Sequence, residues 1–359
     1  MNAKQTLMNR PATSLATSAL APHDEDADHA ISVDLSVDLS IEAASELVTD
    51  ELQEVEQRLA ELLQSSIAVI PELSGQLAFA GGKRFRPLLA LLAARAAGFT
   101  DPVRITVAAV GELLHTATLL HDDVIDSGEY RRGRPTARLS YGNGMAVLTG
   151  DFCLARGLQA IAYAGRLSAV QTLADAVTRM AEGEVAQLQV AGDATVDRDR
   201  YYLVIDRKTA ALIAWCASLG GLVEPRIAAA LHRYGLEIGY AFQIADDVLD
   251  YTSGVDQTGK ARGQDLRDGK LTLPLILACS HDPGLRRRLQ QLLGDGPPID
   301  PNAAAELVAR VANSSAVEQA AAVAEAHAAV AVAQLYQLPA SPARDALAAL
   351  ARYVARRRT

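Results

Sequence analysis

Aromatic residues are scarce in this chain. They make up 4% of its 359 residues, whereas 50% of the residues are hydrophobic, and alanine and leucine abound. Strands favour aromatic and β-branched side chains, while alanine and leucine lose little conformational freedom in a helix. The sequence also lacks segments that alternate apolar and polar residues between hairpin turns. This composition and pattern predict an all-α fold with a large core.

Cysteine is nearly absent as well. The three that occur, Cys153, Cys216 and Cys279, stand far apart and form no CxxC pair. We interpret them as small core residues of a protein in a reducing compartment, not as a disulfide framework or a zinc site. The sequence also has no uninterrupted apolar run of bilayer length, since the segment IAWCASLGGLV is too short. We therefore expect a cytoplasmic protein without a transmembrane segment.

Basic residues are fewer than acidic residues in this chain. The chain has 34 lysine and arginine residues against 43 aspartate and glutamate residues, which gives a formal net charge of −9. Proteins that bind nucleic acids are more often basic, so we expect no nucleic-acid partner. The basic residues that matter for function must then be clustered locally.

The first 45 residues differ from the rest of the chain. They are rich in Ala, Ser, Thr and Asp, include the repeat SVDLSVDLS, and have too little apolar sequence to offset the entropy cost of ordering. We expect residues 1–45 to be a disordered tail. An organellar targeting peptide is the alternative, because residues 1–23 hold Lys4 and Arg10 and no acid. Residues 46–359 are expected to form one helical domain.

Helical periodicity marks this domain from about Val48 onward, because apolar residues recur every three or four positions. The clearest expected helices span 103–126, 144–165, 168–192, 199–222 and 226–250. The connection 282–300 contains several glycines and prolines, and we expect it to be rich in loops. In all, the pattern predicts about ten helices or more.

A basic loop precedes one of the expected helices, in the segment LAFAGGKRFRP. The Gly-Gly pair breaks the preceding segment, and Pro87 fits the first turn of the next helix. Lys83, Arg84 and Arg86 would then lie at a helix N-terminus, where free N–H groups and the helix dipole suit a phosphate. The alternative is a solvated basic loop.

Two acidic boxes of the form DDxxD each follow an apolar helical run. The first comprises Asp122, Asp123 and Asp126, and the second comprises Asp246, Asp247 and Asp250. Aspartates four residues apart lie on one face of a helix, so the outer two of each box can share Mg²⁺ ions while the middle one supports them. A single box would be interpreted as a solvated helix end. Two boxes, each followed by Lys or Arg, predict a metal-binding cleft at the rim of a hydrophobic cavity.

Metal ions, clustered bases and an apolar cavity together indicate an allylic diphosphate as substrate. Breaking its C–O bond requires the leaving diphosphate to be stabilised by Mg²⁺ and by Lys and Arg. The resulting carbocation needs a dry pocket, because water would quench it. This reaction needs no Ser-His-Asp or Cys-His set, and none is evident in the sequence.

Several segments resemble the trans-isoprenyl (polyprenyl) diphosphate synthase family, in order along about residues 48–359. They are GGKRFRP, HTATLLHDDVIDSGEYRRGRPT, GDFCLARGL, DRKTAAL, FQIADDVLDYTSGVDQTGKARGQDLRDGKLTLP and YVARRR. The resemblance implies an isoprenoid-synthase fold around an elongated central cavity, and a homodimer. It also implies Mg²⁺-dependent condensation of isopentenyl diphosphate with an allylic diphosphate, with several ions, three of them once substrate is bound.

The resemblance further implies roles for individual residues. Isopentenyl diphosphate would be bound by Lys83, Arg86, His115 and Arg132. The allylic diphosphate would be bound by Arg131, Lys208, Thr209, Gln243 and Lys260. Mg²⁺ would be ligated by Asp122, Asp126, Asp246 and Asp250. Catalysis would depend on Asp122, Asp126, Asp246, Lys208 and Lys260, with support from Asp123, Asp247 and Lys270.

Product length should depend on the residues beneath the first box. Ala117 and Thr118 are small, whereas bulky aromatic residues at these positions stop chain growth early in the family that the sequence resembles. We therefore hypothesise a medium-chain or long-chain polyprenyl product, such as a precursor of a quinone side chain. A twenty-carbon product is the alternative.

Two other functions are alternatives from the sequence. His121 precedes Asp122 and shares a helix with His115, as in an HD-type metal phosphohydrolase, but no further histidine in the helical domain has an acidic partner at useful spacing. We interpret His121 as structural. A non-catalytic helical partner subunit is the second alternative, although such subunits of the resembled family typically lose aspartates and both boxes are intact here.

Overall fold

The computed structural model describes residues 41–356, apart from 82, 132, 253–261 and 295. In this part of the chain almost all regular structure is helical, and the only strands are two residues long. They are β1 (Tyr130–Arg131) and β2 (Arg134–Pro135), which pair antiparallel with Tyr130 opposite Pro135. The prediction of an all-α fold is confirmed.

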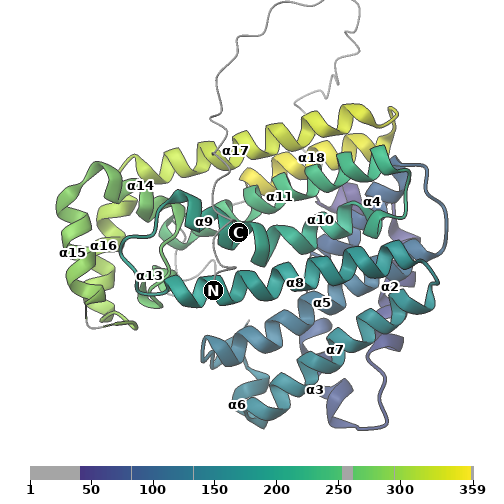
Figure 1. The fold of residues 1–359 in the computed structure, drawn as a ribbon, viewed down its shortest axis with the longest axis horizontal. Coiled ribbons are helices and arrows are strands. Elements are labelled where there is room, and N and C mark those ends of the chain that lie inside the picture. The colour runs from purple at the N-terminus through teal and green to yellow at the C-terminus, as the bar shows by residue number, and fades with distance from the viewer. Residues whose placement is uncertain (1–40, 82, 132, 253–261, 295, 357–359) are drawn as a thin grey trace, which may run out of the picture. The chain divides into compact units, whose positions relative to one another are not determined.

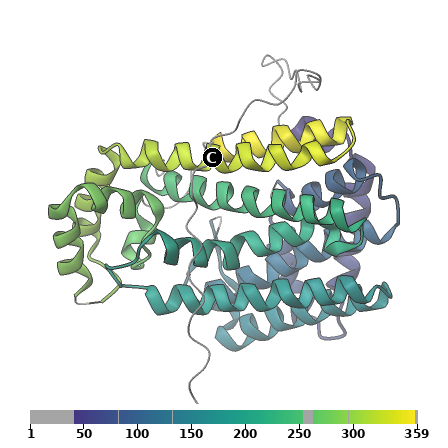
Figure 2. The same ribbon diagram turned by 45° about the horizontal axis from the view of Figure 1, so that its top comes forward.

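The acidic boxes lie on two long helices at the centre of the domain. α5 (Val103–Ile125) packs against α7 (Asn143–Tyr163), and α11 (Pro225–Thr252) packs against α17 (Ala316–Gln334) and α18 (Pro342–Arg356). Figures 1 and 2 both show α17 and α18 side by side along α11. This layering leaves the C-terminal ends of α5 and α11 to carry the site.

α5 is apolar on nearly every side, which is typical of a buried helix. Val107, Leu113 and Leu120 are fully buried on it. Among the described residues, α5 alone is long and apolar enough to cross a membrane, and 61% of its most apolar window is buried within the protein. A mostly buried core helix passes the same test of length and composition, so this is weak evidence for a membrane span.

Small residues allow α10 (Ala211–Ala217) to approach both long helices closely. A Cβ added to Gly111 on α5 would lie 2.5 Å from Cys216 Sγ, and one added to Gly235 on α11 would lie 2.5 Å from Ala214 Cα. Burial raises the pKa of Cys216 to about 12, so its thiol stays neutral in the core. This placement agrees with cysteine as a small core residue.

The remaining elements complete the domain. Before α5 come α1 (Ile41–Glu46), α2 (Thr49–Leu62), α3 (Val69–Ala78) and α4 (Phe85–Ala96). Between α5 and α11 come α6 (Ala137–Tyr141), α8 (Leu167–Val190), α9 (Arg198–Ile205), the π-helical turn η1 (Asp206–Ala210) and the 3-10 turn η2 (Leu219–Gly221). After α11 come α13 (Gln264–Arg267), α14 (Leu273–His281), α15 (Pro283–Leu293), α16 (Pro301–Ala312) and the 3-10 turn η3 (Leu335–Gln337).

The predicted tail is too long at its C-terminal end. α1 begins at Ile41, before the predicted domain boundary at residue 46, and it buries Ala44. α1 contacts α18, so this short helix is stabilised by a partner far away in sequence that local composition could not reveal. Residues 1–40 of the predicted tail lie outside the described residues.

The loop predicted over 282–300 is largely helical, because α15 covers Pro283–Leu293. Its leucines at intervals of four, Leu285, Leu289 and Leu293, are buried. The Asp282 side chain accepts the first free N–H groups of the helix, and Pro283 occupies its first turn, where a missing N–H costs nothing. Here proline marks the start of a helix.

Candidate active site

The first acidic box lies at the C-terminal end of α5. Asp122 is partly buried, and Asp126 follows the last helical residue, Ile125, and is exposed. Each carboxylate is near a lysine from a distant segment: Lys208 Nζ lies 3.7 Å from Asp122 Oδ1, and Lys270 Nζ lies 3.1 Å from Asp126 Oδ2. The outer aspartates therefore meet cations from two other parts of the fold.

Both ion pairs lie in a region crowded with carboxylates. Burial raises the pKa of Asp122, the positive charge of Lys208 opposes that shift, and the negative charges of Glu184 and Asp126 add to it. Burial alone would lower the pKa of Lys270, but neighbouring carboxylates, with Asp126 the strongest, raise it above its ordinary value. A cation that enters this region is favoured by the surrounding negative charge.

The middle aspartate of the first box faces inward. Asp123 is 2% exposed, and its Oδ1 accepts a hydrogen bond from Nε of Arg131 at 2.9 Å and forms an ion pair with Nη2 of the same guanidinium at 2.9 Å. Because Arg131 belongs to β1, this pair ties the small hairpin to the end of α5. The contact between a buried carboxylate and a forked guanidinium fixes where Arg131 lies.

The helix expected over 199–222 is interrupted in its middle. α9 passes into the π-helical turn η1, which carries Lys208 and Thr209, and then into α10. Glycines on both sides let neighbouring helices touch this turn: a Cβ on Gly183 would lie 2.5 Å from the Lys208 backbone nitrogen, and one on Gly239 would lie 2.5 Å from Ala210 Cα. The π turn is therefore clamped between α8 and α11.

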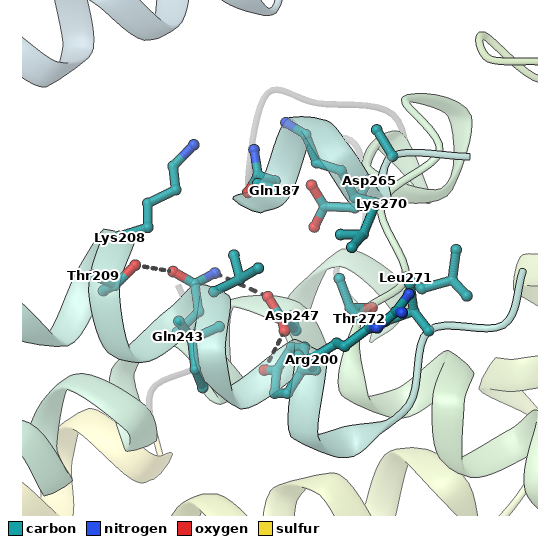
Figure 3. Close-up of a pocket in the computed structure, with 16 residues that line it drawn as sticks. Gln187, Arg200, Lys208, Thr209, Gln243, Asp247, Asp265, Lys270, Leu271 and Thr272 are labelled. Carbon is teal, nitrogen blue, oxygen red and sulfur yellow. Dashed lines mark hydrogen bonds between the residues drawn. The ribbon is translucent and has the colours of Figure 1, made fainter. Parts of the chain in front are cut away.

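A chain of hydrogen bonds joins η1 to the second acidic box, as Figure 3 shows. Thr209 Oγ1 donates to Gln243 Oε1 at 2.8 Å, and Gln243 Nε2 donates to Asp247 Oδ1 at 2.9 Å. The hydroxyl of Tyr201 donates to the other oxygen of Asp247 at 2.6 Å. Burial, together with the charge of Asp265, raises the pKa of Asp247 well above its ordinary range. Asp247 is thus an internal anchor for Gln243.

The two outer aspartates of the second box have different surroundings. Asp246 is partly buried, and its charge acts on Arg86 from the basic loop. The carboxylate of Asp250 accepts backbone N–H groups of Gln264 at 3.2 Å and Asp265 at 3.3 Å, at the start of α13. Asp250 therefore holds the segment that follows the second box, and any metal would have to share it with that contact.

Arg84 of the basic loop has a structural role. It precedes α4 with a left-handed backbone, at φ 46°. Its guanidinium meets Glu56 Oε1 at 2.5 Å and Glu112 Oε1 at 3.3 Å, and it donates to the carbonyl of Ala78 at 2.6 Å. These contacts tie the loop to α2 and α5.

The other two basic residues of this segment, Lys83 and Arg86, have different surroundings. Lys83 Nζ donates to the hydroxyl of Tyr353 at 2.7 Å, and burial lowers the pKa of Arg86 against the opposing charge of Glu112. Within the described part of the chain, the buried Nε of Arg86 has no hydrogen-bond partner. A buried guanidinium nitrogen without a partner suits an incoming anion.

A cavity of about 180 Å³ adjoins this site, with polar and apolar walls (Figure 3). Its polar wall comes from Lys208, Thr209, Gln243, Asp247 and Lys270. Its apolar wall includes Val190, Val204, Ile205 and Leu271. The cavity thus brings residues of η1, the second box and the segment before α14 together.

No three metal-binding side chains lie together within the described residues. Lys208 and Lys270 instead stand beside Asp122 and Asp126. The carboxylate oxygens of the two boxes are hard ligands of the kind that Mg²⁺ prefers. Mg²⁺ commonly completes its coordination shell with water and substrate phosphates. The residues therefore fit an ion that binds together with a diphosphate.

The chain is similar to proteins of one known family. The sequence pattern described as polyprenyl synthetase matches residues 68–311, more than half of the chain. This chain belongs to the polyprenyl synthetase family. The predicted resemblance, the isoprenoid-synthase fold and the prenyltransferase class are therefore confirmed.

Individual polyprenyl synthetases are similar over most of the chain. Octaprenyl diphosphate synthase of Escherichia coli is 41% identical over 239 residues, which cover 66% of this chain and 74% of that one. Heptaprenyl diphosphate synthase component 2 of Geobacillus stearothermophilus is 36% identical over 314 residues, 86% of this chain and 97% of that one. The crystal structure of a Caulobacter crescentus polyprenyl synthase with calcium and isoprenyl diphosphate superposes with a TM-score of 0.85 at 36% identity, covering 89% and 98% of the two chains.

Most residues predicted to act in a polyprenyl synthetase fall within the described part. His115 lies partly buried on α5, and Thr118 Oγ1 donates to its backbone carbonyl at 2.8 Å. Ala117 is 4% exposed on the same helix. Arg132 and Lys260 lie outside the described residues. The roles assigned to all these residues stay predictions.

Sequence reasoning missed two acidic residues of this polyprenyl synthetase. Glu184 Oε2 lies 2.5 Å from Lys208 Nζ, and Asp206 begins the π turn and contacts two other helices. Neither belongs to a DDxxD box. The one signal was the proximity of Glu184 to a glycine in EGEVAQLQ, since glycine inside a helix often marks a close approach.

His121 does not lie in a metal cluster of the described residues. Its Nε2 lies 3.2 Å from the carbonyl of Val147 and 3.2 Å from Asp151 Oδ1, both on α7. A Cβ on Gly150 would lie 2.4 Å from the same nitrogen. His121 thus packs α5 against α7, which agrees with a structural histidine.

Proposed function

We propose that this chain elongates an allylic diphosphate with isopentenyl diphosphate, head to tail and in the trans configuration, to a medium-chain or long-chain polyprenyl diphosphate. One observation carries the proposal: the first box, the π turn and the second box converge through Lys208, Thr209 and Gln243. Membership in the polyprenyl synthetase family supports the reaction class. The named products of the relatives above, with seven and eight prenyl units, support the length.

The residues then divide the chemistry between two substrates. Asp122, Asp126 and Asp246, with Asp250 if its contact to α13 allows, would hold Mg²⁺. The bound ions supply charge that stabilises the leaving diphosphate. Lys208, Thr209, Gln243, Arg131 and Lys260 would bind that diphosphate, with Lys270 beside Asp126. Lys83, Arg86, His115 and Arg132 would bind isopentenyl diphosphate.

The reaction breaks the allylic C–O bond and forms one C–C bond. The double bond of isopentenyl diphosphate attacks the allylic cation, and the departing diphosphate accepts the proton that is lost. Lys208, whose Nζ lies 3.7 Å from Asp122 Oδ1, would stabilise the negative charge that develops on the leaving group. The buried apolar side chains of α5 and α10 would help to exclude the water that quenches the cation.

The test is an assay of the purified full-length chain with Mg²⁺, isopentenyl diphosphate and farnesyl diphosphate, followed by chromatography of the dephosphorylated products. We expect products of about seven prenyl units or more, and no product after a chelator removes the metal. A twenty-carbon end product would contradict the proposed length. Activity that requires a second protein, as the name "component 2" of one relative suggests for that protein, would contradict an autonomous enzyme.

Replacing Asp122 or Asp246 by alanine should lower turnover by about 100-fold or more, because charge stabilisation at the leaving group is lost. Helix content measured by circular dichroism should not change. Asp175→Ala is the matched control, since Asp175 is an exposed aspartate on α8. Near-normal activity of either box variant would contradict the metal cleft.

We also propose that the enzyme is a cytoplasmic homodimer, as the family resemblance implies. Sedimentation of the same preparation measures its assembly. A monomer at the concentrations where the enzyme is active would contradict a functional dimer.

A further inference from the structure

The direction of Lys208 and Thr209 depends on an irregular turn. A π-helical turn inserts one extra residue into a helix, so the side chains after it are rotated by about 100° relative to a continuous α-helix. If η1 relaxed to regular helix, Lys208 and Thr209 would point elsewhere. Something must therefore hold the turn in its wider form.

Asp206, the first residue of η1, is tied to both neighbouring helices. Its Oδ1 accepts a hydrogen bond from the hydroxyl of Tyr240 on α11 at 2.6 Å, and its Oδ2 accepts one from Nη2 of Arg179 on α8 at 2.5 Å. The two carboxylate oxygens thus have one partner each, from opposite sides. A side chain held in this way cannot rotate without losing a charge-assisted hydrogen bond.

Tyr240 is itself held in place. Its ring lies edge-on to Tyr202, at a centroid distance of 5.8 Å, and to His327, at 5.2 Å. His327 is fixed by Glu237 at 2.6 Å through Nδ1 and by the hydroxyl of Tyr202 at 2.9 Å through Nε2. Burial and the charge of Asp206 raise the pKa of Tyr240, so its phenol remains a proton donor to that carboxylate. The donor is pre-positioned by α9, α11 and α17.

The glycine clamp cannot do this task alone. Gly183 and Gly239 permit close approach of η1 to α8 and α11, but a missing side chain does not select one rotation of the turn. Asp206 supplies a directional contact at the start of the turn, two residues before Lys208. A partly exposed ion pair contributes little to stability by itself. Its effect should therefore appear mainly in how Lys208 and Thr209 are presented.

We propose that Asp206, anchored by Tyr240 and Arg179, is a positioning residue that holds the π turn so that Lys208 and Thr209 face the allylic diphosphate. The inference rests on the proposed function, because it assumes that these two residues bind that substrate. Three of the residues predicted to bind isopentenyl diphosphate fall in the described part: His115 on α5, Arg86 on α4 and Lys83 in the loop before α4. These three make no part of the anchor, so the two substrates should respond differently.

The experiment compares Asp206→Asn and Tyr240→Phe with wild type in the first condensation, with the concentration of each substrate varied separately. We expect kcat/KM for the allylic diphosphate to fall by about 10- to 100-fold in Asp206→Asn, because small misplacement of a binding group has effects of this size. The fall should be smaller in Tyr240→Phe, which keeps Arg179. KM for isopentenyl diphosphate and the midpoint of thermal unfolding should stay close to wild type.

Tyr163→Phe is the matched control. It also removes a tyrosine hydroxyl, but Tyr163 is 81% exposed at the end of α7 and takes no part in the anchor. Allylic kinetics in Tyr163→Phe should match wild type. Wild-type kinetics in both anchor variants would overturn the proposal, as would a parallel loss for both substrates together with a lower unfolding midpoint. An inactive wild type would instead overturn the proposed function.

Discussion

At Lys208, two carboxylates surround one ammonium group. Glu184 Oε2 lies 2.5 Å from Nζ, while Asp122 Oδ1 lies 3.7 Å away. The side chains of Lys208 and Glu184 are 23% and 17% exposed, so their pair is shielded more than an ordinary surface ion pair. Glu184 therefore determines where the ammonium lies before substrate enters.

Glu184→Gln should lower kcat/KM for the allylic diphosphate by about tenfold, because a charge-assisted hydrogen bond is worth about 1.5 kcal/mol more than none. Glu182→Gln is the matched control. Glu182 pairs with Arg207 at 2.8 Å between the same two elements, but its side chain is 50% exposed. Steady-state kinetics of both variants, with the allylic substrate varied, make the measurement. Equal effects of the two substitutions would argue that the loss is not specific to Lys208.

The outer aspartates of the boxes show what spacing alone can reveal. Asp122 and Asp126 have i, i+4 spacing, and each lies near a lysine that lines the cavity. Asp250 has the same spacing from Asp246 but accepts backbone N–H groups at the start of α13. Helical spacing predicts which side chains share a face. It does not reveal what a neighbouring segment places opposite that face.

At the scale of the element, the π turn is the feature that decides the site. Gly183 on α8 and Gly239 on α11 let η1 lie between two helices at backbone contact. A continuous helix was predicted there because the apolar periodicity of 199–222 persists across the turn. The inserted residue shifts the apolar pattern by one position, but every residue of α10 is buried, so no polar face after the turn reveals the shift.

Gly183→Ala should lower the free energy of unfolding by about 1–3 kcal/mol, as overpacking does, since the new Cβ would lie 2.5 Å from the Lys208 nitrogen. Allylic activity should fall with it, because the clamp around η1 must open. Urea denaturation and the elongation assay make the two measurements.

Gly144→Ala on α7 is the control for Gly183→Ala. A Cβ there meets nothing within 4 Å, and alanine favours a helix over glycine by up to about 1 kcal/mol. This variant should be as stable as wild type or slightly more so. Equal destabilisation of both glycine variants would refute the close packing at Gly183.

At the scale of the whole molecule, α5 links the core to the reaction. It is buried along most of its length and ends in the first acidic box. Ala117, five residues before Asp122, is 4% exposed, so its side chain points into the protein. A growing apolar product that follows α5 away from the box would pass this level of the helix.

Ala117→Phe should therefore shorten the product, because the added phenyl ring would fill buried space that the growing prenyl chain needs. Chromatography of the dephosphorylated products measures the distribution. Ala117→Val serves as an intermediate step in size and should shorten the product less. A distribution unchanged in both variants, with the enzyme folded and active, would show that position 117 does not face the growing chain.

The sequence by itself determined the helical class, the long helices α5 and α11, and the acidic and basic motifs. These follow from contacts between residues three or four positions apart, which composition and spacing record directly. The tertiary structure alone decided that Lys270 meets Asp126 and that Arg179 meets Asp206, pairs separated by 144 and 27 residues. Such pairs depend on which helices pack side by side, and no local pattern along the chain encodes that choice.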